Sequence, residues 1–152
     1  MIQAFAAQLS KVPIVSAMLL AVTMSATAVR AQQCQAYNPL SLPANNEVSD
    51  SLSDKDIPTG QGGFARDYTV NLSAGDNVAI DLTSESFDTI VTLLAKDGST
   101  VAENDDGPDG STNSLLFTRI KDAGTYIVRV RAFGETAGGQ FKLKVTRLRP
   151  VQ

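Results

Sequence analysis

The sequence contains no histidine and only one cysteine in 152 residues. Without histidine, neither a Ser-His-Asp nor a Cys-His catalytic arrangement can be assembled, and no histidine-based zinc site is available. Cys34 cannot form an internal disulfide and has no base in its neighbourhood. The adjacent carboxylates Asp105 and Asp106 remain as acid–base candidates, but they stand in a turn of solvated character. We therefore predict that the protein is not an enzyme.

Positive charge is also scarce. Residues 1–31 carry Lys11 and Arg30, and without them the chain has 11 basic against 16 acidic residues. This balance argues against nucleic-acid binding. Four of the basic residues occupy alternate positions in two strand-like segments: Arg129, Arg131, Lys142 and Lys144. If those segments are neighbours, the four cations form one stripe that could meet an acidic polymer or protein, whereas a solvated and partly neutralised face is the plainer interpretation.

The N-terminal segment is uncharged from Val12 to Val29 and ends in Val29-Arg30-Ala31, with small side chains at the −3 and −1 positions of a cleavage site. This pattern is typical of a secretory signal peptide cleaved after Ala31. A transmembrane anchor is the alternative, because roughly 18 apolar residues is the lower edge of a membrane span. Pro13 and the Ser and Thr residues of the run favour export. We predict a secreted protein, periplasmic or extracellular, with no membrane association after cleavage.

Helical periodicity is absent from the remaining chain, which instead alternates apolar and polar residues with a period of two. The clearest examples are ARDYTVNL (65–72), DNVAIDL (76–82), GTYIVRVRA (124–132) and GQFKLKVTR (139–147). The segment DTIVTLLA (88–95) is apolar on both faces, which predicts a central strand covered on both sides. Asp97-Gly98 follows it as a hairpin signal. Regularly spaced strands with one polar face predict an antiparallel β-sandwich, although the pattern alone does not exclude a barrel.

The predicted division of the chain is a signal peptide (1–31), an extended leader (32–46), a β-sandwich (47–148) and a short C-terminal tail (149–152). The leader, QQCQAYNPLSLPANN, contains two prolines and little periodicity, so we expect it not to pack as an element of its own. About 120 mature residues make one domain with a modest core. We expect this domain to be a monomer.

An acidic stretch, AENDDGPDG (102–110), places several oxygen ligands close together. Calcium takes six to eight oxygens from carboxylates, amides and carbonyls. The spacing is not that of an EF-hand, so further ligands must come from elsewhere, either Asp88 or the acidic segment from Glu47 to Asp56. The predicted metal ligands are Asp88, Asn104, Asp105, Asp106 and Asp109. A plain solvated turn, in which Asp and Asn bond their own backbone, is the alternative.

Several motifs occur in an order typical of one family: FDTIVTLLAKDG (87–98), AENDDG (102–107), AGTYIVRV (123–130) and the Gly139-Gln-Phe-Lys-Leu strand. On these motifs the chain resembles the bacterial pre-peptidase C-terminal (PPC) domain from about Glu47 to Leu148. The resemblance implies an eight-stranded β-sandwich of jelly-roll type, non-catalytic and usually appended to extracellular proteases or other exported enzymes. Some similar domains, including the collagen-binding domains of clostridial collagenases, bind calcium and adhere to a polymeric substrate.

Together these features predict a secreted, non-catalytic module for binding or interaction at the cell surface or outside the cell. Its partner would be an extracellular polymer or a secreted protein that the sequence does not name. The alternative is an accessory domain that supports folding, secretion or targeting of a separate extracellular peptidase. Leu115 and Phe117, if they point outward, add a small apolar spot to the surface.

Overall fold

The computed structural model describes residues 37–60, 62–108, 110–134 and 138–148. The predicted signal peptide, Cys34, Asp109 and the C-terminal tail lie outside these residues. The described residues form ten strands and no helix, so no helix long and apolar enough to cross a membrane occurs among them. The strands are β1 (Leu40–Ser41), β2 (Glu47–Leu52), β3 (Ile57–Pro58), β4 (Phe64–Leu72), β5 (Asn77–Thr83), β6 (Thr89–Leu94), β7 (Thr100–Asn104), β8 (Ser114–Arg119), β9 (Gly124–Ala132) and β10 (Gly139–Leu148).

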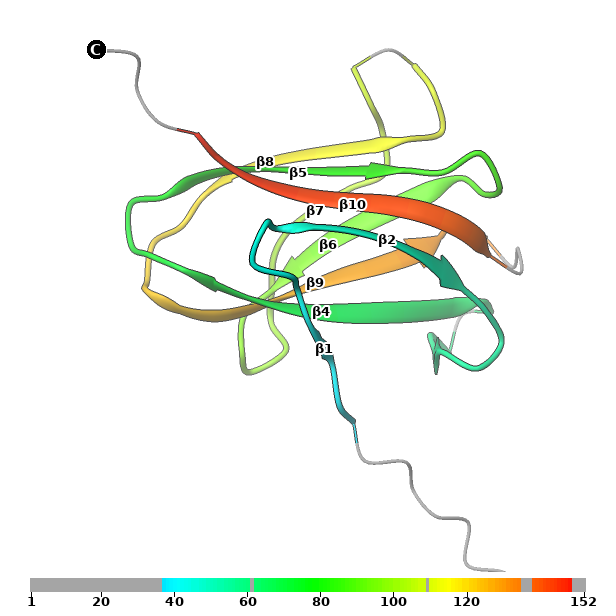
Figure 1. Cartoon of the computed structure of the whole chain (residues 1–152), viewed down its shortest axis with the longest axis horizontal. Coiled ribbons are helices and arrows are strands. Elements are labelled where there is room, and N and C mark those ends of the chain that lie inside the picture. The colour runs from blue at the N-terminus through cyan, green and yellow to red at the C-terminus, as the bar shows by residue number, and fades with distance from the viewer. Residues whose placement is uncertain (1–36, 61, 109, 135–137, 149–152) are drawn as a thin grey trace, which may run out of the picture. The chain divides into compact units, whose positions relative to one another are not determined.

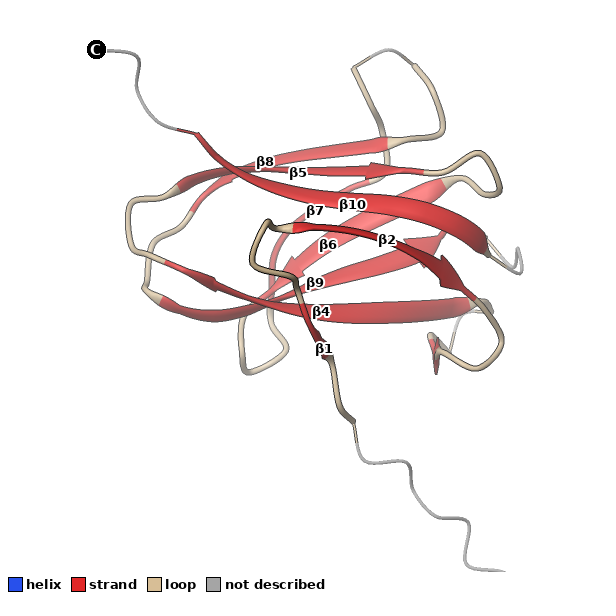
Figure 2. Cartoon of the chain, in the orientation of Figure 1, coloured by secondary structure: helices blue, strands red, loops and turns tan. Residues whose placement is uncertain are grey.

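The strands form two sheets (Figures 1 and 2). The six-stranded sheet has the order β1-β4-β9-β6-β7, with β3 also paired to β4, and the four-stranded sheet has the order β2-β10-β5-β8. All pairings are antiparallel except that of β1 with β4. Consecutive strands mostly alternate between the two sheets, as a jelly roll requires. The predicted jelly-roll sandwich is confirmed, and its eight long strands are joined by the two-residue strands β1 and β3.

The described part of residues 32–46, predicted as an extended leader, contacts the sandwich. Leu40 and Ser41 pair with Tyr68 and Thr69 of β4, and Leu42 packs against the core. A two-residue strand carries no detectable alternation, which is why the sequence gives no sign of it.

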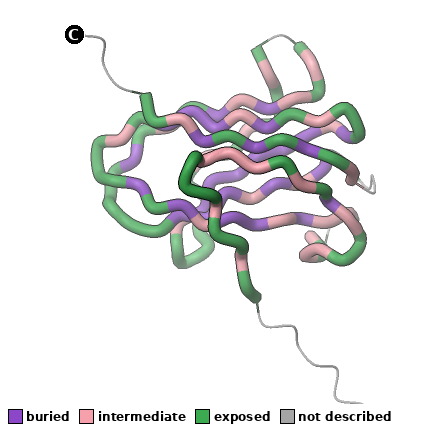
Figure 3. The backbone as a smooth tube through the Cα atoms, in the orientation of Figure 1, coloured by how far each residue is buried: buried purple, intermediate pink, exposed green. Residues whose placement is uncertain are grey.

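The core lies between the sheets and is built from the alternating apolar positions of both (Figure 3). Ile80, Leu82, Leu93 and Leu143 are fully or almost fully buried there. Phe141 joins the layers by edge contacts with the rings of Tyr68 and Phe87, at centroid distances of 6.3 and 6.4 Å. Edge-to-face contacts of this kind add to the stabilisation from apolar burial.

Strand β6 occupies the position that its sequence predicted. It lies between β9 and β7, and all six of its residues are buried. The hairpin to β7 turns at Asp97-Gly98, where the Gly98 N–H donates to the Ala95 carbonyl at 2.9 Å. Gly98 has a φ of 85°, a conformation that favours glycine.

The entry into β10 depends on two glycines. Gly138 has a φ of 96°, and a Cβ on it would lie 2.6 Å from the Leu52 carbonyl oxygen. A Cβ on Gly139, whose φ is 144°, would overlap Ser86. The backbone of β10 can therefore approach both β2 and the loop after β5 only because neither position carries a side chain.

Candidate functional site

The outer face of the six-stranded sheet is held by an ion-pair network. Asp67 is only 2% exposed, and Arg129 donates to both of its carboxylate oxygens at 2.8 Å. The Tyr37 hydroxyl, from the segment before β1, donates to Asp67 Oδ2 at 2.7 Å. Burial and this hydrogen bond raise the pKa of Tyr37 to about 12. Hydrogen bonding to Asp67 raises the pKa of Arg129. The network fastens the N-terminal segment to β4 and β9.

A second polar cluster on the same face joins β6, β7 and β9. Thr92 Oγ1 donates to Glu103 Oε2 at 2.6 Å, and Arg131 Nη2 donates to the same oxygen at 3.1 Å. The hydrogen bond from Thr92, together with Arg131, lowers the pKa of Glu103. Two shallow hollows of about 330 and 270 Å³ lie beside this cluster. The arginines that line them already have carboxylate partners, and Asp105 lines the smaller hollow.

The acidic segment near β2, the second place considered for calcium, is neutralised by an arginine. Arg66 contacts Asp50 Oδ1 at 2.5 Å and Asp56 Oδ1 at 2.7 Å, and the Tyr68 hydroxyl donates to Asp50 Oδ2 at 2.7 Å. Burial pushes the pKa of Asp50 upward, but the hydrogen bonds from Tyr68, the Ser51 N–H and Arg66 outweigh it and lower the pKa. The guanidinium supplies the positive charge that a cation would otherwise bring to these two carboxylates.

The acidic loop after β7 is organised by an amide side chain. Asn104 Oδ1 accepts from the N–H groups of Asp105 and Asp106 at 3.1 and 3.4 Å. Asn104 Nδ2 donates to the carbonyl oxygens of Asp106 at 2.9 Å and Leu115 at 2.7 Å. Asn104 thus holds the turn and the start of β8 together, whereas Asp105 and Asp106 are exposed and their carboxylates accept no hydrogen bond from other described residues.

The other predicted metal ligands are only partly placed. Asp88 precedes β6, and its carbonyl oxygen accepts from the Phe133 N–H at 2.8 Å. Asp109 lies outside the described residues. Among the residues that are described, no three carboxylate or cysteine side chains come together closely enough to hold a metal ion. Calcium binding at this loop therefore stays a prediction.

The four cations, which would form one stripe only if their two strands were neighbours, do not lie together. Arg129 and Arg131 belong to β9 of the six-stranded sheet, and Lys142 and Lys144 belong to β10 of the four-stranded sheet. The two strands are not neighbours, so the arginines and the lysines lie on opposite outer faces. Consecutive strands of a jelly roll alternate between sheets, and alternation along one strand cannot reveal this.

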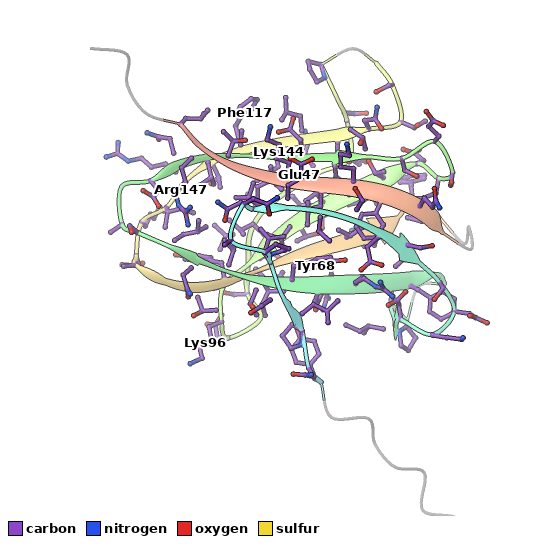
Figure 4. All side chains as sticks on the ribbon, in the orientation of Figure 1. Glu47, Tyr68, Lys96, Phe117, Lys144 and Arg147 are labelled. Carbon is purple, nitrogen blue, oxygen red and sulfur yellow. The ribbon has the colours of Figure 1, made fainter. Side chains whose placement is uncertain are left out.

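The outer face of the four-stranded sheet is open. Along β10, the outward Lys144 has Glu47 of β2 and Asp81 of β5 as its cross-strand neighbours. Lys144 and Glu47 lie close together on this face, and Phe117 lies on β8 at the rim (Figure 4). Phe117 is 63% exposed, which confirms that it points outward.

A groove of about 700 Å³ crosses this face where β2, β10 and the end of β5 meet. All but one of its lining residues are polar, and they are Ser49, Asp50, Ser51, Thr83, Ser84, Glu85, Ser86, Asn113, Gln140 and Lys142, with Phe141 as the apolar member. Ser84 is used internally, since its hydroxyl donates to the Gln140 carbonyl at 2.7 Å. The side chains of Ser49, Ser51 and Gln140 form no hydrogen bond with other described residues. The groove thus presents hydroxyl and amide groups that are free to bind a ligand.

The sequence analysis did not identify these groove residues. Ser49 and Ser51 alternate with other residues of β2 in the ordinary pattern of a solvated strand face. Gln140 and Thr83 are far from them in sequence and meet them only through the pairing of β10 with both β2 and β5. Knowledge of the strand order would have been needed to bring these residues together.

Fold and surface together define an all-β jelly-roll module with one open, polar outer face. Residues 65–132, from β4 to β9, match the family model described as "Bacterial pre-peptidase C-terminal domain". A solved structure of the pre-peptidase C-terminal domain of collagenase from Bacillus anthracis is similar with a TM-score of 0.53 and 19% identity, over 72% of this chain and 93% of that chain. The family match of residues 65–132 and the shared fold confirm the resemblance to the PPC domain that was inferred from the sequence.

Two further comparisons complete the description. The periplasmic inhibitor of g-type lysozyme from Aeromonas hydrophila has a TM-score of 0.49 and 13% identity, over 72% of this chain and 96% of that chain. No curated protein sequence matches the chain. PPC domains are non-catalytic accessory domains, which is consistent with the non-catalytic module predicted from the sequence.

Proposed function

We propose that this PPC domain is secreted and binds an extracellular polymer through the groove on the outer face of its four-stranded sheet. The observation that carries the proposal is that Ser49, Ser51 and Gln140 line this groove and that their side chains form no hydrogen bond with other described residues. Such groups both donate and accept hydrogen bonds. They suit an uncharged polar chain, such as a polysaccharide or the main chain of an extended polypeptide.

The contrast with the other outer face supports this choice. On the six-stranded sheet, the charged side chains of Asp67, Arg129, Glu103 and Arg131 are paired with one another. A ligand there would have to replace existing hydrogen bonds, whereas a ligand in the groove replaces only water. The groove is also shallow and open, which suits a long chain that passes across it better than a small molecule that must be enclosed.

The test is co-sedimentation of the mature protein with insoluble polysaccharides and, separately, with insoluble collagen. Ser49→Tyr and Gln140→Tyr place bulky side chains in the groove, and we expect either substitution to lower binding at least tenfold. Thr100→Tyr, on an exposed strand residue of the other sheet, is the matched control and should leave binding unchanged. Binding that is equal in all four proteins would place the polymer elsewhere. No binding to any polymer would remove the proposal.

The alternative function is support for the folding, secretion or targeting of a separate extracellular peptidase. The association of the PPC family with peptidases favours it. In that case the exported protein should co-purify with a peptidase from its own organism, and deletion of its gene should lower the secreted amount of that peptidase. The groove substitutions would then have no effect on polymers but would weaken this complex, or would leave it intact if another surface is used.

We further propose that calcium binds at the acidic loop, with Asp105 and Asp106 as the main ligands and Asn104, Asp109 and Asp88 as helpers. The physical reason is electrostatic, because a divalent ion relieves the repulsion between neighbouring carboxylates. Asp105 and Asp106 are exposed and free of side-chain hydrogen bonds within the described part of the chain, so they can turn toward an ion without loss.

Thermal unfolding with a chelator and then with millimolar calcium tests this proposal. Calcium that binds only the folded state raises the midpoint as its concentration rises. We expect the rise to disappear in the double variant Asp105→Ala/Asp106→Ala. A wild-type midpoint that does not respond to calcium leaves the loop as a turn. A rise that survives the double substitution would place the ion elsewhere.

A further inference from the structure

Two aspartate–glycine pairs lie wholly within the described residues, and they differ in how the fold binds their polar groups. One is Asp97-Gly98, in the hairpin between β6 and β7, and the other is Asp106-Gly107, in the loop between β7 and β8. Glycine has no side chain to shield its peptide nitrogen, so the carboxyl group of a preceding aspartate can react with that nitrogen. Figure 1 shows the loop between β7 and β8 projecting from the sandwich.

At Asp97-Gly98, both groups that would react are already hydrogen-bonded. The Asp97 carboxylate accepts from the N–H and the hydroxyl of Ser99, at 3.0 and 2.7 Å. These bonds lower the pKa of Asp97, which keeps the carboxyl group ionised and unreactive. The Gly98 N–H donates to the Ala95 carbonyl at 2.9 Å. The hairpin therefore protects this pair from a reaction between its side chain and its main chain.

At Asp106-Gly107, the same two groups have no hydrogen-bond partner among the described residues. Asp106 is exposed, and its carboxylate accepts no hydrogen bond from another described residue. The Gly107 N–H likewise donates to no described acceptor. The carboxyl group and the nitrogen of this pair are therefore available to each other.

The carbonyl oxygen of Asp106, in contrast, is held by two donors. The Leu115 N–H donates to it at 3.1 Å, and Asn104 Nδ2 donates to it at 2.9 Å. Hydrogen bonds to a carbonyl oxygen stabilise the negative charge that develops on it. When the Gly107 peptide nitrogen loses its proton, part of the negative charge lies on this oxygen. The two donors therefore make the Gly107 nitrogen easier to deprotonate and more nucleophilic.

We propose that Asp106 is a site of spontaneous isomerisation to isoaspartate. The Gly107 nitrogen loses its proton and bonds to Cγ of the protonated Asp106 carboxyl group, from which one oxygen leaves as water. The product is a five-membered succinimide ring. Water then adds to one of the two ring carbonyls and breaks its bond to the nitrogen, which takes up a proton. Addition at the α-carbonyl gives isoaspartate, and addition at Cγ restores aspartate, so the mass of the chain is unchanged.

Of the two products, the fold favours isoaspartate. The α-carbonyl of the ring carries the oxygen to which Leu115 and Asn104 donate, so these donors stabilise the charge that develops when water adds there. In isoaspartate the same oxygen belongs to a free carboxylate, and hydrogen bonds to an ionised acceptor are stronger than those to a neutral one. The main chain gains one methylene between Asp106 and Gly107, while the loop keeps its attachment to β8. The reaction needs only water and time, so the modified fraction increases with the age of the protein.

The test is incubation of the purified mature protein at neutral pH, with a chelator so that calcium at the loop plays no part. Mass spectrometry with electron-transfer fragmentation of the tryptic peptide 97–119 then separates isoaspartate at Asp97, Asp106 and Asp109. We expect isoaspartate to form at Asp106 at least tenfold faster than at Asp97. A rate at Asp106 that is no greater than the rate at Asp97 would overturn the proposal.

The same incubation in urea separates the effect of the fold from that of the sequence. Unfolding removes the hydrogen bonds at both pairs, so Asp97 and Asp106 should then react at similar rates. The share of isoaspartate among the products at Asp106 should also fall, because the two donors no longer hold the α-carbonyl. A preference for Asp106 that is as large in urea as in the folded protein would contradict the structural cause.

Two variants assign the reaction to its atoms. Asp106→Glu would have to close a six-membered ring, and we expect it to abolish the modification at this position. Gly107→Ala places a methyl group beside the nitrogen at a glycine that has no positive φ, and it should slow the reaction at least tenfold. If peptide 97–119 of Asp106→Glu accumulates isoaspartate as fast as the wild-type peptide does, the reaction lies at another aspartate and the proposal is wrong.

Discussion

Both sheets have polar side chains on their outer faces, but these side chains differ in whether they form hydrogen bonds within the protein. On the six-stranded sheet, Asp67 and Glu103 accept hydrogen bonds from Arg129, Arg131, Thr92 and Tyr37. On the four-stranded sheet, the side chains of Ser49, Ser51 and Gln140 form no hydrogen bond with other described residues. The first face uses its polar groups to hold the N-terminal segment and neighbouring strands, and the second keeps them available.

The difference shows that charge on a strand face is a poor guide to function. Arg129 and Arg131 belong to the four cations considered as one stripe in the sequence, yet each is paired with a carboxylate. The neutral residues Ser49 and Gln140 are not conspicuous in the sequence, yet they line the groove of about 700 Å³ on the four-stranded sheet. A polar side chain is available to a ligand only if it forms no hydrogen bond within the protein. Which side chains form such bonds depends on the strand order.

The largest effect that separates the two faces should come from Asp67→Ala. Removing this buried carboxylate leaves Arg129 without its partner and the Tyr37 hydroxyl without its acceptor. Loss of one member of a buried ion pair costs about 3 kcal/mol or more. We expect the free energy of unfolding in urea to fall by about 3 kcal/mol. The matched control is Asp81→Ala on the open face, which should change it by less than about 0.5 kcal/mol. Equal losses in the two variants would contradict the distinction.

The fold was more predictable from the sequence than the site was. The alternation in β4, β5, β9 and β10 and the doubly apolar β6 predicted an antiparallel sandwich, and the resemblance to the PPC family added the jelly-roll topology. The acidic loop was recognised as a turn with possible ligands, but the use of Asn104 to hold β8 was not visible. The pairing of Asp67 with Arg129 depends on residues that are 62 positions apart. Such contacts follow from strand order, which local periodicity does not contain.

Acid should weaken the described ion-pair networks. The pKa values of Asp50 and Glu103 are lowered in the folded state, so their contribution to stability is present above the ordinary carboxyl pKa and is lost as the pH falls. We expect the free energy of unfolding to decrease between pH 6 and about pH 3. Asp50→Asn, which keeps the acceptor but does not titrate, should make this decrease shallower. Glu103→Gln should have a smaller effect because Glu103 is more exposed. An unchanged slope in Asp50→Asn would contradict the assignment.

A smaller effect is expected at the N-terminal segment. Tyr37→Phe removes one hydrogen bond to the buried Asp67, and a single hydrogen bond contributes about 1 kcal/mol. We expect this loss in urea unfolding, together with faster proteolysis before β1, because the segment is then held only by the short pairing with β4. Tyr126→Phe, which removes a hydroxyl bonded to the Asp122 carbonyl, is the control and should not change that proteolysis. Unchanged cleavage in Tyr37→Phe would show that β1 holds the segment by itself.

We expect the smallest effect on stability from substitutions in the groove, and this small effect distinguishes a binding surface from a structural one. Ser49→Ala and Gln140→Ala remove side chains that bond to no other described residue, so the free energy of unfolding should change by less than about 0.5 kcal/mol. If these substitutions also lower polymer binding, the loss belongs to the contact and not to the fold. A loss of stability comparable with that of Asp67→Ala would mean that the groove is structural, and the two outer faces would no longer differ in kind.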